Sequence, residues 1–528
     1  MPRAMVVLFL ILLPLAAAAQ PPGTYAISGG TVHPVNGPPI ENGVVVIRDG
    51  LIAAVGAGLS PPADATVLDA TGLHVYPGLF DAYTALGLPA APAAPGDPYD
   101  LGSAGDTPPE ATASVEAADL IRIDPEAADA KRATGVTTVM SAPASGIFGG
   151  QSAILNLGEG DLHTLLIRTP ASFQLSFNPR RGGVYPASLM GVISFARQTF
   201  LDARQHATAT SIYSDDPAGR RRPAPNADLA ALAPVMAREL PIVIAADDEL
   251  MMRRARAIAG EFRLRWILAG ASDSYAMSDT IAGWQVPVLF SVDFPRPPSK
   301  QEDRADQPLR VIRDRVLGPT GPAELSRRNV PFALVSGPRA KGGALMEGVR
   351  KVIDAGLTKE AALEALTLAP ARIFGVDRQL GSLERGKIAN VVVTAGEIFD
   401  EESEVRHLLV DGRLMRLPEK KEEAEAPSPT EGAWDLSIRA AEGILAIRIQ
   451  LDVDGELVSG TYSGDLGSGD IGNGSIEGNT IRFVLHHTAS SGTETSDWRF
   501  EGTVEGDTMT GTVDTTVGQY EFSGSRPQ

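Results

Sequence analysis

The sequence contains no cysteine among its 528 residues. This absence excludes disulfide bonds, thiolate metal ligands, cysteine nucleophiles and lipid attachment through cysteine. Histidine is scarce as well, with only 7 residues in the whole chain. Basic residues are outnumbered by acidic ones, 46 against 65, which gives a formal net charge of -19. Because proteins bind nucleic acid mainly through Lys and Arg, this balance argues against a nucleic-acid partner.

The chain begins with an apolar run that is too short for a membrane span. The run covers residues 5–15, whereas a transmembrane helix needs about 20 apolar residues. Arg3 precedes it, and four alanines at 16–19 follow it. This order of a basic residue, a short apolar stretch and small residues is typical of a secretory signal peptide. We therefore expect residues 1–19 to be cleaved, no membrane span, and a periplasmic or secreted mature protein.

A charged stretch separates two parts of the chain that have different patterns. Residues 418–430 are rich in Glu, Lys and Pro and poor in apolar side chains, as is typical of a solvated linker. In residues 431–528, short alternating segments are separated by Gly-, Asn- and Asp-rich turns. This period of two predicts a separate all-β domain, either a barrel or a sandwich, built as an up-and-down meander.

The part before the linker predicts an α/β fold. Residues 25–73 alternate β-branched runs with turns, which indicates a small β domain. From residue 79 to about residue 375, apolar strand patterns alternate with amphipathic helix patterns, for example a helix at 188–207. Short buried strands that alternate with helices over about 300 residues predict a (β/α)8 TIM-type barrel. Two inserted loops are expected, at 89–109 and 214–226.

Several segments resemble the amidohydrolase superfamily, especially its imidazolonepropionase-like branch. They are GGTV at 29–32, VVVIRDGLIAAVG at 44–56, VLDATG at 67–72, PGLFDA at 77–82, ATGVTTV at 133–139, LTKEAA at 357–362, PARIFG at 370–375 and LGSLERGKIANVVV at 380–393. Each segment is short, but the series keeps its order and spacing over residues 25–417. The resemblance implies a barrel at 77–379 and one composite small β-sandwich domain formed by 24–76 and 380–417.

The resemblance implies a metal-dependent hydrolase, but the chain departs from the family at the metal ligands. The family uses zinc or another divalent ion to activate water, held by a His-x-His pair, a mid-barrel carboxylated Lys or Glu, two later His and a final Asp. The positions that we align with these ligands are Tyr83, Ala85, Ala245, Ala269 and Gly337. No Lys occurs within 132–299. We therefore expect no metal cofactor.

The remaining histidines do not form a metal motif in the sequence. Between residues 86 and 406 only His163 and His206 occur, and two histidines cannot replace a full ligand set. We expect His206 to be a solvated residue near the end of a helix and His163 to be a loop residue. His486 and His487 are adjacent on a predicted strand, so they point to opposite faces.

Carboxylates at predicted strand ends are the weak candidates for catalysis without a metal. Asp247, Asp248 and Asp273 lie just past predicted strands, at the end of the barrel where such folds place their sites. A pair of carboxylates in a closed pocket can differ in pKa and act as acid and base. Most such residues are instead helix N-caps or solvated loop groups. Asp81 is expected to make a structural hydrogen bond.

Two functions remain open. We favour an exported amidohydrolase-family protein that has lost metal-dependent hydrolysis and acts as a non-catalytic binding or partner subunit. It would bind an unidentified small molecule, or form a homodimer or a heteromer with a metal-competent relative. The alternative is a hydrolase acting on carbon-nitrogen or related bonds through a rebuilt or metal-free site. The fold alone does not decide between them, because function depends on the site.

Overall fold

The computed structural model describes residues 23–89, 112–144, 146–179, 185–297, 307–338, 344–417, 430–440, 443–454, 457–488, 495–515 and 518–527. The chain divides into two compact units, Met1–Pro418 and Glu419–Gln528, and we describe each by itself. The expected signal peptide lies outside the described residues. So do the expected linker, apart from Thr430, and the expected loop at 89–109, apart from its first residue.

One mixed β-sheet joins the two ends of the first unit. Its strands are β1 (Tyr25–Val32), β2 (Ile40–Arg48), β3 (Leu51–Ala57), β4 (Thr66–Asp69), β5 (His74–Pro77), β16 (Val391–Ala395), β17 (Glu404–Val410) and β18 (Arg413–Met415), in the order β18-β17-β16-β5-β1-β2-β3 with β4 on β1. The pairing of β16 with β5 brings residues that are about 300 positions apart into register. Val45 of β2 and Val391 of β16 share one buried cluster, so the sheet encloses a core of its own.

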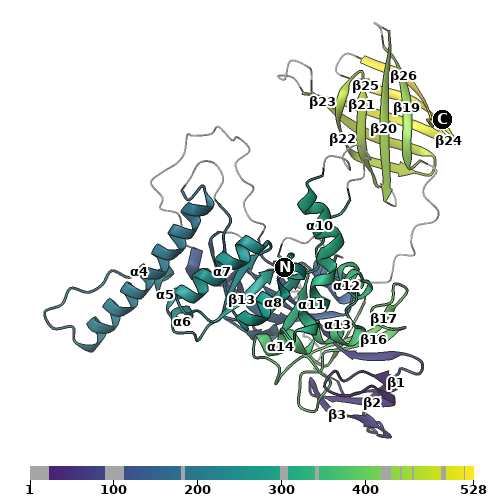
Figure 1. The fold of residues 1–528 in the computed structure, drawn as a ribbon. Helices are drawn as coiled ribbons and strands as arrows, with labels where there is room; N and C mark the ends of the chain where they lie inside the picture. Colours follow the sequence, from purple (N-terminus) through teal and green to yellow (C-terminus); the bar gives the residue numbers. More distant parts are fainter. Residues whose placement is uncertain are drawn as a thin grey trace, which may run out of the picture. The chain divides into compact units, whose positions relative to one another are not determined.

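A TIM-type barrel lies between β5 and β16 in the chain (Figure 1). Its strands are β6 (Leu79–Thr84), β7 (Val136–Ser141), β8 (Phe148–Gln151), β9 (Ala153–Asn156), β11 (Phe173–Ser176), β12 (Ile242–Ala246), β13 (Trp266–Gly270), β14 (Val288–Ser291) and β15 (Phe332–Val335), with the short β10 (Leu166–Arg168) paired to β9. Side chains alternate along each strand. Val243 points into the barrel interior, whereas Ile242 and Ile244 pack outward under the helices.

One barrel strand runs against the others, which the strand–helix pattern did not predict. Strands β8 and β9 are separated only by Ser152, so residues 148–156 form one nearly continuous strand. It pairs antiparallel with β7 through β9 and antiparallel with β11 through β8. The physical reason is the length of the connection, since β7 ends at Ser141 and β8 begins at Phe148. A crossover between parallel strands needs a dozen or more residues. A link as short as this one can join only antiparallel strands.

Helices surround the barrel. They are α1 (Ala117–Leu120), α2 (Pro125–Ala133), α3 (Leu162–Leu165), α4 (Leu189–Asp215), α5 (Ala227–Ala231), α6 (Ala233–Met236), α7 (Glu249–Glu261), α8 (Ser274–Trp284), α10 (Leu309–Leu317), α11 (Gly321–Arg327), α12 (Ala344–Asp354), α13 (Lys359–Ala365) and α14 (Leu368–Ile373), with 3-10 turns at Thr112–Ser114 and Gly318–Thr320. In the described part of the chain, none of these helices has the length and apolar character to cross a membrane.

Helix α4 is longer than the sequence pattern predicted. Ser188 caps its start through a bond from the Gly191 amide, and its buried residues end at Ala203. The remaining turns, up to Asp215, extend away from the barrel (Figure 1). The apolar period therefore locates the packed half of α4, whereas the exposed half has no apolar period that the sequence analysis could detect.

The second unit is a closed antiparallel barrel. Its strands are β19 (Gly432–Ala440), β20 (Gly443–Asp454), β21 (Leu457–Gly464), β22 (Gly467–Glu477), β23 (Thr480–Thr488), β24 (Thr495–Glu505), β25 (Thr508–Thr515) and β26 (Gly518–Ser525), and β26 pairs back with β19. The expected up-and-down barrel is confirmed. Trp434 is fully buried in its core, donates to the Thr430 carbonyl at 2.8 Å and packs under the Arg526 guanidinium.

We predict that residues 430–528 fold without the rest of the chain. The barrel is closed, so none of its strands has an unpaired edge that another strand would have to cover. It also has its own apolar core around Trp434 and Phe500. Far-ultraviolet circular dichroism of the fragment should show β-structure that melts cooperatively. As a control, Trp434→Ala in the fragment should cost about 3–5 kcal/mol, as core aromatic truncations do. A disordered spectrum for the unsubstituted fragment would contradict a separate domain.

Candidate functional site

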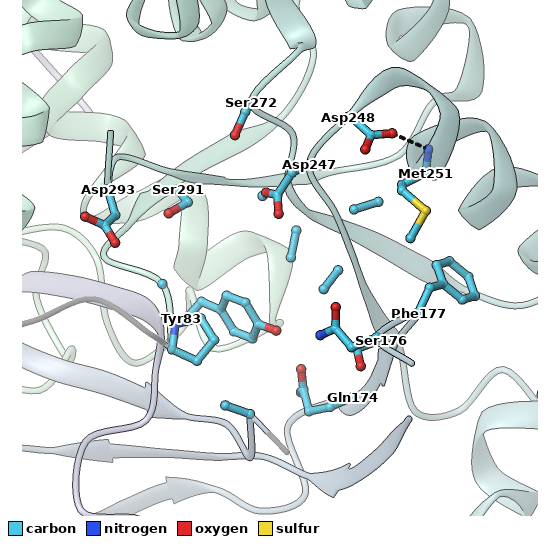
Figure 2. A pocket seen from close by; sticks show the side chains of 18 of the residues that line it. Tyr83, Gln174, Ser176, Phe177, Asp247, Asp248, Met251, Ser272, Ser291 and Asp293 are labelled. Carbon is cyan, nitrogen blue, oxygen red and sulfur yellow. Dashed lines mark hydrogen bonds between the residues drawn. The ribbon is translucent and has the colours of Figure 1, made fainter. Parts of the chain in front are cut away.

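The carboxyl ends of the parallel barrel strands surround a cavity of about 420 Å³. Its described lining comes from the ends of β6, β11, β12, β13, β14 and β15 and from α10. Figure 2 shows Tyr83, Gln174, Asp247 and Asp293 arranged around this space. TIM-type barrels carry their sites at this end, because loops from many strands meet there. The cavity is therefore the candidate functional site of the first unit.

The structure brings together most of the positions that we align with the family's metal ligands. Tyr83, Ala245, Ala269 and Gly337 all line the cavity, whereas Ala85 is not among its lining residues. Because Tyr, Ala and Gly occupy these positions, they offer no imidazole or carboxylate to the cavity. The described lining includes no histidine at all. These side chains do not fit a zinc site, which takes about three protein ligands of the His, Cys, Asp or Glu types.

Two of these strand ends require glycine. Gly337 has a φ of +88°, and a Cβ built there would lie 3.0 Å from Ser291 Oγ. Gly270 has a φ of +95°, and its Cβ would lie 2.1 Å from Asp247 Oδ1. L-residues with side chains rarely adopt such a backbone conformation. The lack of a side chain at Gly270 leaves room for the Asp247 carboxylate at the end of β13.

The three carboxylates proposed from the sequence have different roles. Asp247 and Asp248 line the cavity. Asp248 is also the N-cap of α7, where it accepts from the Met251 amide at 2.8 Å (Figure 2). Asp273 is not among the cavity-lining residues, and its carboxylate accepts from the Glu249 amide at 3.1 Å. Two of the three thus bond the first turn of one helix, which is the ordinary structural role of such residues.

Other polar residues of the cavity were missed by the sequence analysis. Gln174 on β11, Asp293 after β14, and Arg310 and Asp314 on α10 all line it. Asp293 carries the same signal as Asp247, an acidic residue within two positions of a strand end, and could have been found. Gln174 interrupts an otherwise apolar strand, which is a weaker signal. The residues of α10 carry no signal, because only the fold brings that helix to the mouth.

Burial changes the acidity of Asp314. Desolvation raises the pKa of this carboxyl above its ordinary value, and the nearby carboxylate of Asp273 raises it further. Arg310 acts in the opposite direction, and the Asp248 carboxylate adds a smaller increase. A carboxyl group with a raised pKa holds its proton to higher pH than a solvated one. Asp314 therefore keeps its proton to higher pH than a solvated aspartate does.

A buried ion pair lies directly behind the cavity. Asp81, on β6, is fully buried and accepts from Lys131 Nζ of α2 at 2.7 Å. The same carboxylate accepts from the Ser336 amide at 3.0 Å and from Ser336 Oγ at 2.6 Å. Ser336 and Tyr83 both line the cavity, and the Gly337 amide donates to the Tyr83 carbonyl at 2.9 Å. Asp81 thus makes the structural hydrogen bonds expected of it and joins β6 to the end of β15.

The histidines of the described chain lie away from this cavity. His163 is exposed in the short α3, not in a loop as expected, and His206 on α4 lies 3.3 Å from the Ala224 carbonyl. His486 and His487 belong to β23 of the second unit, and their side chains lie outside the described residues. Among the described residues, no three His, Cys, Asp or Glu side chains are grouped so that they could hold a metal ion.

Comparison with known proteins identifies the fold of the first unit. Residues 323–415 match the amidohydrolase family. An amidohydrolase from Thermotoga maritima MSB8 is 23% identical, with 75% of this chain and 100% of that chain covered and a TM-score of 0.63. Two further structures are less similar. An A. niger ochratoxinase is 18% identical, with 74% of this chain and 95% of that chain covered and a TM-score of 0.43. A putative prolidase from Bifidobacterium longum is 16% identical, with 76% of this chain and 97% of that chain covered and a TM-score of 0.45. No curated protein sequence matches the chain.

We predict that the Asp81–Lys131 pair is required for stability. Lys131→Met should cost about 3–5 kcal/mol in urea unfolding, because it leaves a buried carboxylate without its counter-charge. The double variant Asp81→Asn, Lys131→Met should recover part of this loss, since Asn still accepts from the Ser336 amide. Arg197→Met is the matched control, because it breaks an exposed pair with Glu261 and should cost less than about 1 kcal/mol. A Lys131→Met variant as stable as this control would contradict the role assigned to Asp81.

Proposed function

We propose that the chain is a non-catalytic member of the amidohydrolase fold that binds a small molecule at the barrel mouth. The proposal starts from the family match at residues 323–415 and from the amidohydrolase fold of the first unit. One observation carries the proposal. Tyr83, Ala245, Ala269 and Gly337, the positions that we align with the family's metal ligands, meet around one cavity. A cavity of this size lies in the usual range for small ligands, about 300–1,000 Å³.

We further propose that the protein acts after export, in the periplasm or outside the cell. The basic, apolar and small-residue order of residues 1–19 supports this location. A partner role fits the same proposal, either as a homodimer or in a heteromer with a metal-competent relative. The imidazolonepropionase-like branch remains the part of the superfamily that the sequence segments at 29–82 resemble most.

The first test of the proposal is metal binding. Protein produced with excess zinc, manganese or nickel should carry no stoichiometric ion in elemental analysis, and millimolar metal should leave the melting temperature unchanged. The expected difference is large, because a micromolar site in millimolar metal would stabilise the fold by about 4 kcal/mol. Tyr83→His combined with Ala85→His should not create a site, because the later ligand positions keep Ala and Gly. A stoichiometric ion that is lost in Asp247→Asn or Asp293→Asn would overturn the proposal.

A second function is supported by the raised pKa of Asp314 and its place in the cavity lining. A carboxyl group that stays protonated can donate a proton to a leaving group while an ionised neighbour activates water. Asp314 and Asp247 line one cavity, which would permit metal-free hydrolysis of carbon-nitrogen or related bonds. If this function is correct, hydrolysis of a panel of N-acyl amino acids should fall as pH rises through the raised pKa of Asp314, and should be lost in Asp314→Asn. No turnover by the parent protein would support the non-catalytic proposal.

A further inference from the structure

The described lining of the barrel-mouth cavity is acidic. Its carboxylates are Asp247, Asp248, Asp293 and Asp314. Arg310 is the single basic side chain among the described lining residues, and it is 68% exposed to solvent. Its contacts with Asp248 at 3.4 Å and Asp314 at 4.0 Å are long. Exposed ion pairs of this kind contribute little to stability. Because carboxylates outnumber this one exposed guanidinium, the described lining presents a negative field to a ligand.

The floor of the cavity carries a buried acceptor that has no hydrogen-bond donor among the described residues. Gln174 is 3% exposed, and its Nε2 donates to Ser172 Oγ at 2.9 Å. Ser172 Oγ is in turn 2.7 Å from Ser152 Oγ, so the amide is held in place. The Gln174 Oε1 atom is buried without a hydrogen-bond partner among the described residues. In Figure 2 this amide points into the cavity between Tyr83 and Ser176.

A buried acceptor is normally paired, and an unpaired one calls for a donor from a ligand. The negative field above it favours a positive charge. Resting on the function proposed above, we propose that the cavity binds an organic cation with N–H donors, a primary ammonium or guanidinium compound. The ligand donates to Gln174 Oε1 at the floor, and its charge lies between the carboxylates of Asp247 and Asp293.

The shape of the site favours an organic cation over a metal ion. The carboxylates follow β12 and β14 or lie on α10, so they surround the space from several sides. Among the described side chains, none form the three-ligand group that a metal ion requires. Aromatic rings of Tyr83, Phe177 and Phe294 line the same space, and ammonium and guanidinium groups bind aromatic faces.

Four probes of equal carbon-chain length separate charge from size. They are 1,4-diaminobutane, agmatine, 1,4-butanediol and succinate, titrated into the full chain by isothermal calorimetry at low and high salt. We expect binding of at least one of the two cations, weakened by salt, and no binding of the diol or of succinate. The cation proposal is overturned if neither cation binds at millimolar concentration in about tenfold excess over the protein. It is also overturned if succinate or the diol binds more strongly than the cations.

Variants connect the binding to the named atoms. Gln174→Leu should weaken cation binding about tenfold or more, as loss of a hydrogen bond to a charged group does. Asp293→Asn should weaken it and reduce its salt dependence. Glu239→Gln is the matched control, an exposed carboxylate just before β12, at the opposite end of that strand from the cavity, and should bind as the parent does. Melting temperatures of all three variants verify that they fold.

The outcomes distinguish this inference from the function on which it rests. Binding of a neutral or anionic probe that depends on Gln174 keeps the barrel mouth as a ligand site but overturns the cationic class. Cation binding that is insensitive to both Gln174→Leu and Asp293→Asn places the cation elsewhere on the acidic chain and also overturns the inference. A stoichiometric metal ion in the same cavity overturns the function itself.

Discussion

The barrel of the first unit depends on the hydrogen bonds of a single buried carboxylate. Asp81 accepts from the Ser336 amide, the Ser336 hydroxyl and Lys131 Nζ, so it connects the first barrel strand, the end of the last one and helix α2. Two neighbouring cavity residues, Tyr83 and Gly337, are bonded across the same junction. A buried charge whose hydrogen bonds are all made rigidifies its surroundings, because breaking any one of them leaves a buried polar group unpaired. This interaction therefore positions the strand ends that carry Tyr83 and Ser336 into the lining of the cavity.

The sequence was sufficient to predict both barrels, because each depends on local periodicity. Alternation of period two marks β19–β26, and apolar strands followed by amphipathic helices mark the first unit. The antiparallel strand at 148–156 was not predicted, since its direction depends on the length of one connection. The last turns of α4, residues 208–215, were also missed, because none of these residues is buried and they therefore leave no apolar period. The apolar pattern of a sequence indicates which residues are packed. The direction of the strand at 148–156 and the last turns of α4 depend instead on the length of a connection and on exposure to solvent.

The candidate site could be predicted only in part, and the reason is similar. Tyr83, Ala245 and Asp247 lie at strand ends, so a parallel sheet was enough to gather them at one rim. Arg310 and Asp314 reach the same rim from α10, whose position depends on tertiary packing. Gln174 lies within a buried strand, where only the absence of a partner for its oxygen distinguishes it from a structural amide. Such a property belongs to the folded molecule and has no counterpart in the sequence.

The conformation of Gly337 limits substitution at that position. A φ of +88° and the proximity of Ser291 mean that a side chain at this position must strain the backbone and displace a neighbour. For an L-residue the left-handed region costs about 1–2 kcal/mol, and this cost precedes any benefit from a new carboxylate. A side-chain ligand at position 337 would therefore require the backbone at the end of β15 to change its conformation. The backbone at Gly337 thus restricts which positions of the mouth can acquire a new ligand group by a single substitution.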